Sequence, residues 1–515
     1  MNLLLDRWIP VRLRDGSRGV IAVSEIVRPD VIALDFPRLD FNGAVTEFLI
    51  AVLSTTFPPA DDKEWRKLWR HRPSHEELQA AFEPVLAAFE AGVFAQWTAT
   101  PGDDEKPEER TVDRLLIDNL SGSTAEGGRD ILNRAGRIQT LGLPSALAAL
   151  ITLQMHANQG GRGAYQCQRG GGALTTLVRY GTDLWGLVWP NVETIVQIRT
   201  RAVGAIPGDP LAPFPWMWKP GADLGPDNKH PCAIYWTMPR RIKLEISKSN
   251  EATCSLSGEP ATEVVCKFSY VSGGPRFEGW TGHPMSAIVH KKKEGEVVTS
   301  TVVTPIERVG MQHWLGLVQD GDPDVAPAPC VAHAREHRRE PSARLVVHGY
   351  AVKAATVLAW QSAEMPLVLA EASEVDAELR ETARMLVTAT EKAAAATKKA
   401  VKTALGSAAA KDSRKKYING LSDQAYGRVW RDAESAFFAT LSAVPNRMSD
   451  QSDDPARVLR QTFHNQLLKA ARAIVTDLCP DDGLVPRDVI RAHLELHRTL
   501  HSRAMLTTLL LPVAP

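Results

Sequence analysis

Residues 375–386, with the sequence VDAELRETARML, mark the point at which strand-like patterns stop and a helical pattern begins. Apolar side chains return there at helical spacing, at Val375, Leu379, Ala383 and Leu386. Similar stripes follow at 426–441 and 459–478, and Pro486 stands where a fourth helix would open. Because an amphipathic helix must bury its apolar face, we expect residues 366–515 to form a four-helix bundle.

The chain before residue 366 has a different pattern. Short alternating runs rich in branched residues predict strands, among them 173–180, 240–247, 262–270 and 295–303. The acidic stretch 100–110 is expected to be a solvated loop. The sequence therefore predicts an α+β protein, with a large mixed domain over residues 1–365 and the four-helix bundle over residues 366–515.

An uncharged helical stretch lies between two Gly-rich segments. Its apolar part, 141–155, is shorter than the roughly 20 residues that a membrane crossing needs, so we expect a buried helix and no membrane contact. Segment 121–136 precedes it, and NQGGRGAYQCQRGGG, at 158–172, follows it. The second segment has two interpretations: a flexible connection, or a backbone that approaches a ligand closely because glycine has no Cβ. The sequence leaves both open.

The overall composition excludes few function classes. The 60 basic residues balance the 60 acidic residues, so total charge neither predicts nor excludes nucleic-acid binding, which depends on local patches. The six cysteines form no CxxC pair, and the first ten residues contain no basic region ahead of an apolar run. We therefore expect no secretory signal and a reducing, cytoplasmic location.

The sequence contains no Walker phosphate loop, GxGxxG after a strand, GxSxG, HExxH or EF-hand loop. We therefore expect that the protein is not an enzyme, with no catalytic residues and no cofactor. One metal-binding alternative remains, because His493, His497 and His501 share a helical face and zinc can use two such imidazoles. The other interpretation of these histidines is a polar outer face of the last helix.

Basic side chains gather in and after the first helix of the expected bundle. They are Lys398, Lys399, Lys402, Lys411, Arg414, Lys415 and Lys416. Lysine and arginine placed in this way release counterions from DNA, so the cluster suits contact with a nucleic-acid backbone. A solvated surface is the alternative, because most charge runs have no further role.

A series of short motifs resembles one protein family. The opening MNLLLDRWIPVR is followed in order by Phe36-Pro37-Arg38-Leu39-Asp40, Leu120-Ser121-Gly122, Ile131-Leu132-Asn133, Arg169-Gly170-Gly171, Thr175-Thr176, Val178-Arg179, Lys267-Phe268, Trp280 with His283-Pro284, and Gly349-Tyr350. Their order and spacing, together with the expected bundle, resemble the CasA family, the large subunit of the type I-E CRISPR Cascade surveillance complex. The resemblance covers nearly the whole chain.

The resemblance implies a non-catalytic role in RNA-guided antiviral defence. Members of the family read the protospacer-adjacent motif from the minor groove, while guide pairing reads the rest of the target. They also wedge the duplex open and help to recruit a helicase-nuclease. The implied partners are the 5′ handle of the guide RNA, double-stranded target DNA, other Cascade subunits and that helicase-nuclease.

The resemblance also assigns roles to individual residues. The loop containing Ile131, Leu132 and Asn133 would contact the guide handle and the motif, and a glycine loop would approach the minor groove. That glycine loop is Gly160, Gly161, Arg162 and Gly163. Lys267 would enter the groove. The wedge that props the duplex open would be Val352, Lys353, Ala354 and Ala355, and such an insertion exchanges stacking energy for strand separation.

Two departures from the family pattern affect these expectations. Family members often have a glutamine at the wedge tip, where this sequence has Lys353-Ala354, so the preferred motif is not predicted. Some members hold zinc with two CxxC pairs, but here Cys254 has Ser257 in place of its partner, and we expect no structural zinc. Two other functions stay open: a purely structural subunit that does not read sequence, and a metal-dependent nuclease that uses histidines of the bundle.

Overall fold

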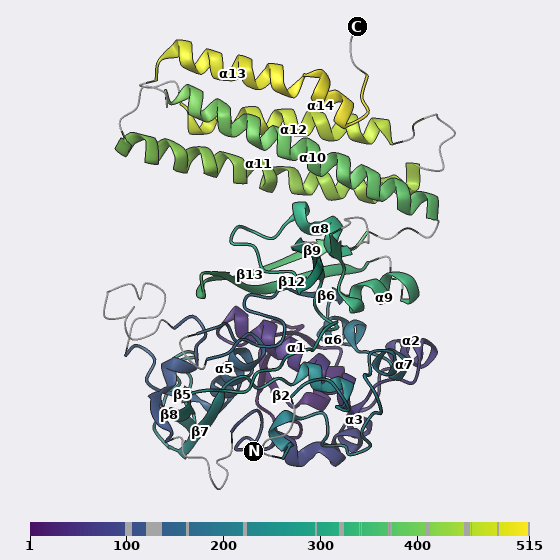
Figure 1. Cartoon of the computed structure of the whole chain (residues 1–515), viewed down its shortest axis with the longest axis vertical. Helices are drawn as coiled ribbons and strands as arrows, with labels where there is room; N and C mark the ends of the chain where they lie inside the picture. The colour runs from purple at the N-terminus through teal and green to yellow at the C-terminus, as the bar shows by residue number, and fades with distance from the viewer. Residues whose placement is uncertain are drawn as a thin grey trace. The chain divides into compact units, whose positions relative to one another are not determined.

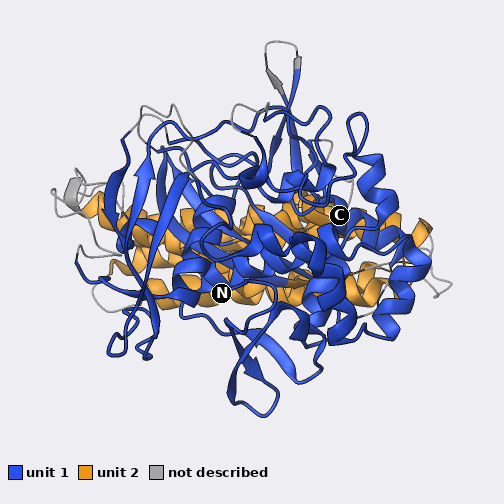
Figure 2. Cartoon of the chain, turned by 90° about the horizontal axis from the view of Figure 1, so that it is seen from below, with its two compact units in different colours: residues 1–308, 323–364 blue, residues 309–322, 365–515 orange. Residues whose placement is uncertain are grey.

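The computed structural model describes the chain except for residues 98–105, 120–135, 161–163, 220–223, 294–295, 319–323, 339, 341, 369, 371–372, 407–411, 448–453, 455, 481–483 and 513–515. The chain divides into two compact units, which Figure 2 colours separately. Unit 1 contains Met1–Arg308 and Pro323–Glu364. Unit 2 contains Val309–Asp322 and Met365–Pro515.

Unit 1 contains several small antiparallel sheets (Figure 1). The sheet nearest the N-terminus has the order β2-β1-β3, from Arg18–Ile21, Ile9–Leu13 and Val31–Leu34. In a second sheet, β8 (Glu263–Val271) pairs with β7 (Arg241–Lys248), β4 (Glu108–Thr111) and β5 (Leu141–Gly142). A third has the order β13-β12-β6, from Thr356–Pro366, Arg344–Lys353 and Thr175–Arg179. A fourth has the order β10-β9-β11, from Glu296–Thr301, Ile288–Lys293 and Val325–Ala326.

The helices of unit 1 are mostly short. They are α1 (Leu39–Thr56), α2 (Asp62–Arg70), α3 (His75–Phe82), α5 (Leu143–Met155), α6 (Trp185–Val188), α7 (Ile195–Thr200) and α9 (Pro329–His337). Helices α1 and α5 pack against each other and are largely buried. Both are apolar almost all round, which is the pattern of a core helix rather than a surface helix. The described part of α5 is therefore a buried helix, as its uncharged sequence predicts.

Unit 2 is helical. Its long helices are α10 (Ser373–Ala404), α11 (Asp412–Arg447), α12 (Arg457–Leu478) and α13 (Pro486–Leu500), and its short ones are α8 (Met311–Val318) and α14 (Arg503–Thr508). Helix α10 contacts α11, α12 and α13, so the apolar stripes read from the sequence meet around it (Figure 1). Gly406, two residues beyond the end of α10, has φ +67°, the left-handed conformation that commonly ends a helix.

The sequence-based division at residue 365 misplaced one segment. Residues 309–322 were expected in the mixed domain, but they belong to unit 2. Trp314 of α8 is fully buried against the rings of Phe437 and Phe438, at centroid distances of 6.1 Å each, and its indole nitrogen donates to the carbonyl of Pro366. This packing depends on residues more than 120 positions apart, which helical periodicity cannot reveal.

The predicted fold class is confirmed: mixed helix and sheet, followed by a helical C-terminal region. The predicted loop at 100–110 was wrong at its end, because Glu108–Thr111 forms β4 and pairs with β8. Within the described residues, no helix is both long enough and apolar enough to cross a membrane.

Candidate nucleic-acid interface

The turn predicted to act as a wedge joins β12 to β13. Its central residues, Ala354 and Ala355, have φ values of 48° and 64°. Positive φ at both central positions is the pattern of a type I′ two-residue hairpin turn, where Asn and Gly are usual. An alanine pays a steric penalty there because its Cβ crowds the backbone. The turn is therefore strained, and neighbouring groups must hold it in place.

One such group is Asn158, at the start of the 158–172 segment. Its side-chain amide donates to the carbonyl of Ala355 over 2.6 Å. The buried Arg240 guanidinium in turn donates to the backbone carbonyls of Asn158 and Tyr165. The turn is thus supported by a segment that is itself anchored.

Two glycines of that segment are required by close contacts, one with Asn158 of the same segment and one with strand β12 of the hairpin. A Cβ added to Gly171 would lie 2.2 Å from the side-chain oxygen of Asn158. Gly172 has φ +76°, and a Cβ there would lie 3.0 Å from the carbonyl of Tyr350. At these two positions the glycines permit close approach to the chain's own backbone and side chains. Neither of the two interpretations offered by the sequence included this one.

A single buried carboxylate connects the same parts. Glu47, in α1, is fully buried and accepts hydrogen bonds from Arg169 (2.8 Å) and Thr175 (2.9 Å). It also pairs with the imidazoles of His156 (3.0 Å) and His348 (2.7 Å). Burial alone would raise the pKa of Glu47, but the Arg169 guanidinium and the His156 imidazole hold it well below its usual range. The charged Glu47 therefore joins α1, the end of α5, the 158–172 segment and β12.

A second buried contact fixes the same strand. The hydroxyl of Tyr350, in β12, donates to the carboxylate of Asp40, at the start of α1. Arg38 pairs with Asp40 over 2.6 Å and with Asp118 over 3.0 Å. Arg38 and Asp40 belong to the motif at 36–40 that supported the family resemblance, so that motif has a structural function here.

A cavity of about 400 Å³ lies beside the turn; we call it the arginine cavity. Its lining includes Arg110, Arg114, Arg240, Asn119, Asn158, Gln159, Gly160, Ala354 and Ala355. The Arg110 guanidinium lies 3.7 Å from the ring centroid of Tyr270 and pairs with Glu108 over 2.8 Å. Asp118 also lines the cavity, and the Arg240 guanidinium is held by backbone carbonyls. Arg110 and Arg114 nevertheless place positive charge beside the strained turn, which suits an anionic chain because arginine binds phosphate groups with fixed geometry.

The sequence-predicted residues of the loops and the wedge fall into three groups. Gly160, Ala354 and Ala355 line the arginine cavity together, although almost 200 residues separate them. Residues 131–133 and 161–163, which carry Ile131, Leu132, Asn133, Gly161, Arg162 and Gly163, lie outside the described residues, as does Lys411. The exposed Lys353 precedes the turn in β12, and Val352 contributes to the contact with Gly172.

Lys267 is not among the residues that line this cavity. It lies on β8 opposite Thr111 of β4, and its ammonium pairs with Glu109 over 2.6 Å. The hydrogen bond from Lys267 to Glu109 raises the pKa of the ammonium. Both side chains are about half exposed, so water screens the pair and the carboxylate competes only weakly with another acceptor.

The basic cluster of unit 2 is partly neutralised. Lys398 pairs with Asp423 over 2.6 Å, and Lys399 pairs with Glu495 over 3.5 Å. Arg414 and Lys416 are exposed at the start of α11 and form no ion pair with another described residue. The remaining predicted members are Lys402, which is half-buried, and Lys415, which is exposed.

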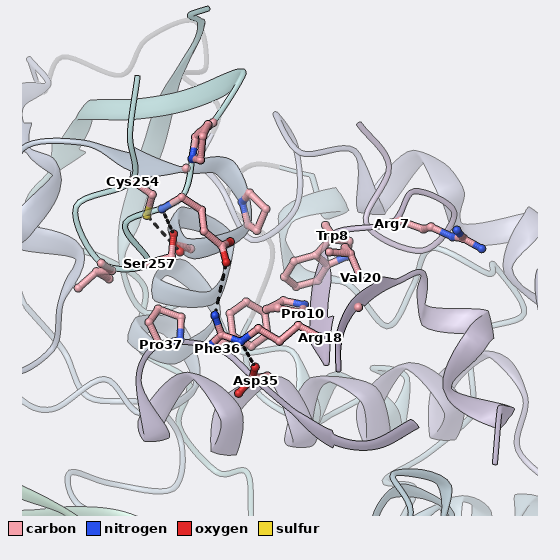
Figure 3. A pocket seen from close by; sticks show the side chains of 18 residues that line it. Arg7, Trp8, Pro10, Arg18, Val20, Asp35, Phe36, Pro37, Cys254 and Ser257 are labelled. Carbon is pink, nitrogen blue, oxygen red and sulfur yellow. Dashed lines mark hydrogen bonds and ion pairs between the residues drawn. The ribbon is translucent and has the colours of Figure 1, made fainter. Parts of the chain in front are cut away.

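Within the described part of the chain, no group of three or more His, Cys, Asp or Glu side chains is arranged to hold a metal ion. In α13 and after it, the rings of His497 and His501 stack at 4.1 Å, and His493 and His497 both line a groove with Leu494. Cys254 and Ser257 line a different cavity, of about 440 Å³, with Trp8 and Phe36 (Figure 3). Burial opposes ionisation of Cys254, but hydrogen bonds with Ser257 and Ser145 leave the pKa of its thiol below the usual value.

Sequence reasoning missed Glu47, Asn158, Arg110, Arg114 and Arg240. Glu47 did have a signal: it interrupts the otherwise apolar interior of the helix that begins at Leu39. A charged residue is rarely buried unless it is paired, so its position in that stretch predicts a buried partner. The arginines had no such signal, because Arg240 lies more than 100 residues from Arg110 and Arg114 and only the fold brings it beside them.

This fold recurs in solved structures of CRISPR-associated proteins. Cse1 from Thermobifida fusca has 19% sequence identity and a TM-score of 0.70, with 100% of this chain and 99% of that chain covered. CasA (Cse1) from Thermus thermophilus has 16% identity and a TM-score of 0.68, with 97% and 99% covered. A chain of a structure described as a CRISPR RNA-guided surveillance complex has 15% identity and a TM-score of 0.67, with 98% and 99% covered.

The fold is thus that of a CRISPR-associated Cse1 or CasA protein. The family model described as CRISPR-associated protein Cse1 matches residues 2–474, and the chain belongs to this family. The resemblance to the CasA family of type I-E large subunits, inferred from short motifs, is confirmed.

Proposed function

We propose that this chain is a non-catalytic subunit of an RNA-guided complex that opens target DNA next to a short flanking motif. The observation that carries the proposal is the strained Ala354-Ala355 turn, held by Asn158 at the edge of the arginine cavity. A small, rigidly supported turn can enter a base step, while the guanidinium groups hold the strand backbone. The hydrogen bonds and glycine contacts described above would keep the turn in its conformation when it meets the DNA.

In this proposal, the chain reads the flanking motif from the minor groove of the DNA. Lys267 is exposed and its only carboxylate contact among the described residues is the solvent-screened pair with Glu109, so it can exchange that partner for a base-edge acceptor. Gly160 lines the cavity and has no side chain to obstruct DNA. The loop that contains Ile131, Leu132 and Asn133 would contact the guide handle, and the exposed basic residues of unit 2 would contact the DNA backbone or another subunit. Recruitment of a helicase-nuclease completes the proposed role.

The test is equilibrium binding of duplex targets to the assembled guide-RNA complex, with and without this chain, across all flanking sequences. We expect tight binding to require both this chain and a particular flank. Lys267→Ala should reduce the preference for that flank by at least about fivefold, because the loss of one discriminating base contact costs at least about 1 kcal/mol of binding free energy. Lys248→Ala is the matched control, since Lys248 is an exposed lysine on β7 of the same sheet.

A different result would favour the structural alternative. If the chain joins the complex but binding is equal for every flank, the chain serves assembly and does not read sequence. Equal effects of Lys267→Ala and Lys248→Ala would also contradict minor-groove reading by Lys267.

A further inference from the structure

A second cavity, of about 260 Å³, lies between residues of the 158–172 segment and residues 276–278; we call it the aromatic cavity. It is lined by Gln159, Tyr165, Gln166, Cys167, Gln168, Arg276, Phe277 and Glu278. Pockets for drug-sized ligands usually enclose roughly 300–1,000 Å³. The aromatic cavity therefore suits a small planar group rather than a large ligand.

Its walls offer a stacking surface. The Arg276 guanidinium lies 4.1 Å from the ring centroid of Tyr165, and Phe277 is buried and lines the cavity. Proteins that bind unpaired nucleotides stack bases on aromatic rings and on guanidinium planes of this kind. Tyr165 is only half-buried, so its ring system is accessible.

The polar groups of the cavity fit a base edge better than a phosphate. Glu278 lies 3.8 Å from Arg276, so the cavity contains a balanced pair of charges rather than an excess of positive charge. The side chain of Gln159 forms no hydrogen bond with another described residue, so its amide can both donate to and accept from a base edge. The amide of Gln168 is fixed, because it donates to the carbonyl of Ile234 and accepts from Thr237.

The two cavities are adjacent, because Gln159 lines both. The segment between them is held by Arg240, which donates to the carbonyls of Asn158 and Tyr165. A nucleic-acid strand whose backbone lies along the arginine cavity can therefore place an unpaired base in the adjacent aromatic cavity. Removing such a base from the stack costs least where the duplex is already open.

We infer that the aromatic cavity binds one unpaired nucleobase next to the point at which the duplex opens, between the Tyr165–Arg276 pair and the amide of Gln159. This inference rests on the proposed function, since the open duplex supplies the unpaired base. It adds a capture site that holds the strands apart after the turn has entered.

The test is photocrosslinking in the assembled complex. 5-Iodouracil, which crosslinks to stacked aromatic side chains, is placed singly at each position of both DNA strands near the flank, and separately in the guide RNA. We expect one position to crosslink to Tyr165, and the labelled strand identifies whether DNA or guide RNA supplies the base. Tyr165→Phe should keep the crosslink and Tyr165→Leu should abolish it. Absence of a crosslink to residues 159–168 or 276–278 from any labelled position overturns the inference.

Affinity supplies the second readout. Tyr165→Leu and Arg276→Ala should each weaken target binding by about 5- to 150-fold, which is the measured worth of base–aromatic stacking. Trp218→Leu is the control, because Trp218 carries a similar cation contact from Lys229 (4.3 Å) but lines neither cavity. Unchanged affinity of the Tyr165→Leu complex contradicts base capture.

A pre-opened forked duplex separates this inference from the proposed function. If the wild-type complex ignores the flank but still crosslinks the forked duplex through Tyr165, duplex opening is wrong and base capture stands. If flank-dependent binding is intact and the forked duplex gives no crosslink, base capture is wrong and the proposed function stands.

Discussion

Replacement of Glu47 by glutamine removes the negative charge from the centre of unit 1 while keeping the side-chain size. Arg169 would lose its carboxylate partner, although only 1% of its side chain is exposed. A buried charge that loses its partner costs about 3–5 kcal/mol, because the remaining ion is held away from water. The glutamine amide has only one acceptor oxygen. If that oxygen faces the histidines, the NH2 group faces the donor of Arg169; if it faces Arg169, a histidine contact is lost. We therefore expect Glu47→Gln to lower the free energy of unfolding of unit 1 by about 3–5 kcal/mol.

The assay is denaturant-induced unfolding of the full chain, followed by tryptophan fluorescence. Glu259→Gln is the matched control, since Glu259 is 65% exposed and pairs with Arg18 only over 3.5 Å; its effect should stay within about 0.5 kcal/mol. Adding Arg169→Met to Glu47→Gln should restore part of the lost stability, because it removes the unpaired charge. A loss below about 1 kcal/mol for Glu47→Gln, or a double variant less stable than the single one, would refute the reasoning.

Three further predictions concern other parts of the chain. Asn158→Asp keeps the side-chain size but cannot donate to Ala355, so permanganate reactivity of unpaired thymines in the bound target should fall while the melting temperature changes little; an unchanged reactivity would contradict support of the turn by Asn158. Reversing the charges of Arg414 and Lys416 should weaken binding to all targets alike and reduce the salt slope by about two, measured by titration at several salt concentrations; a slope equal to that of the wild type would exclude backbone contact. Burial lowers the pKa of His230 to about 4, against about 6.5 when unfolded, so the unfolded chain takes up a proton first as the pH falls. The stability from His230 is present above pH 6.5 and is lost towards pH 4, and His230→Asn should flatten that slope in denaturation curves at successive pH values.

The fold class could be predicted because local patterns determine it. The helices of unit 2 carry their apolar residues at helical spacing, and β7 and β8 carry alternating ones, so each pattern is visible within a short window. Helix α8 and strand β4 could not be assigned in this way. Trp314 reaches the helical unit through a tertiary contact, and Glu108–Thr111 becomes a strand only because β8 supplies its hydrogen-bond partners.

The candidate site was predicted only in part, for a related reason. Resemblance to a family located Ala354, Ala355 and Gly160, because motifs in order along the chain carry that information. It could not locate Asn158 and Arg240, whose roles depend on which backbone carbonyls the fold brings within reach. Nor could it distinguish a flexible glycine segment from a tightly packed one, since both have the same composition.

The contacts of the glycines bear on how the proposed wedge would work. Gly172 leaves no room for a side chain against Tyr350 and Val352 of the strand that carries the turn, and Gly171 leaves none against Asn158, whose amide holds the turn. Glu47 binds Arg169 of that segment and His348 of that strand through the same carboxylate. A force on the turn is therefore transmitted to α1 and to the segment rather than absorbed by bending of the hairpin, because close-packed contacts have few alternative arrangements. The turn, Asn158 and residues 169–172 are thus packed as one element, and if the turn is the wedge that we propose, a substitution at its tip should preserve function only where Asn158 still reaches the carbonyl of residue 355.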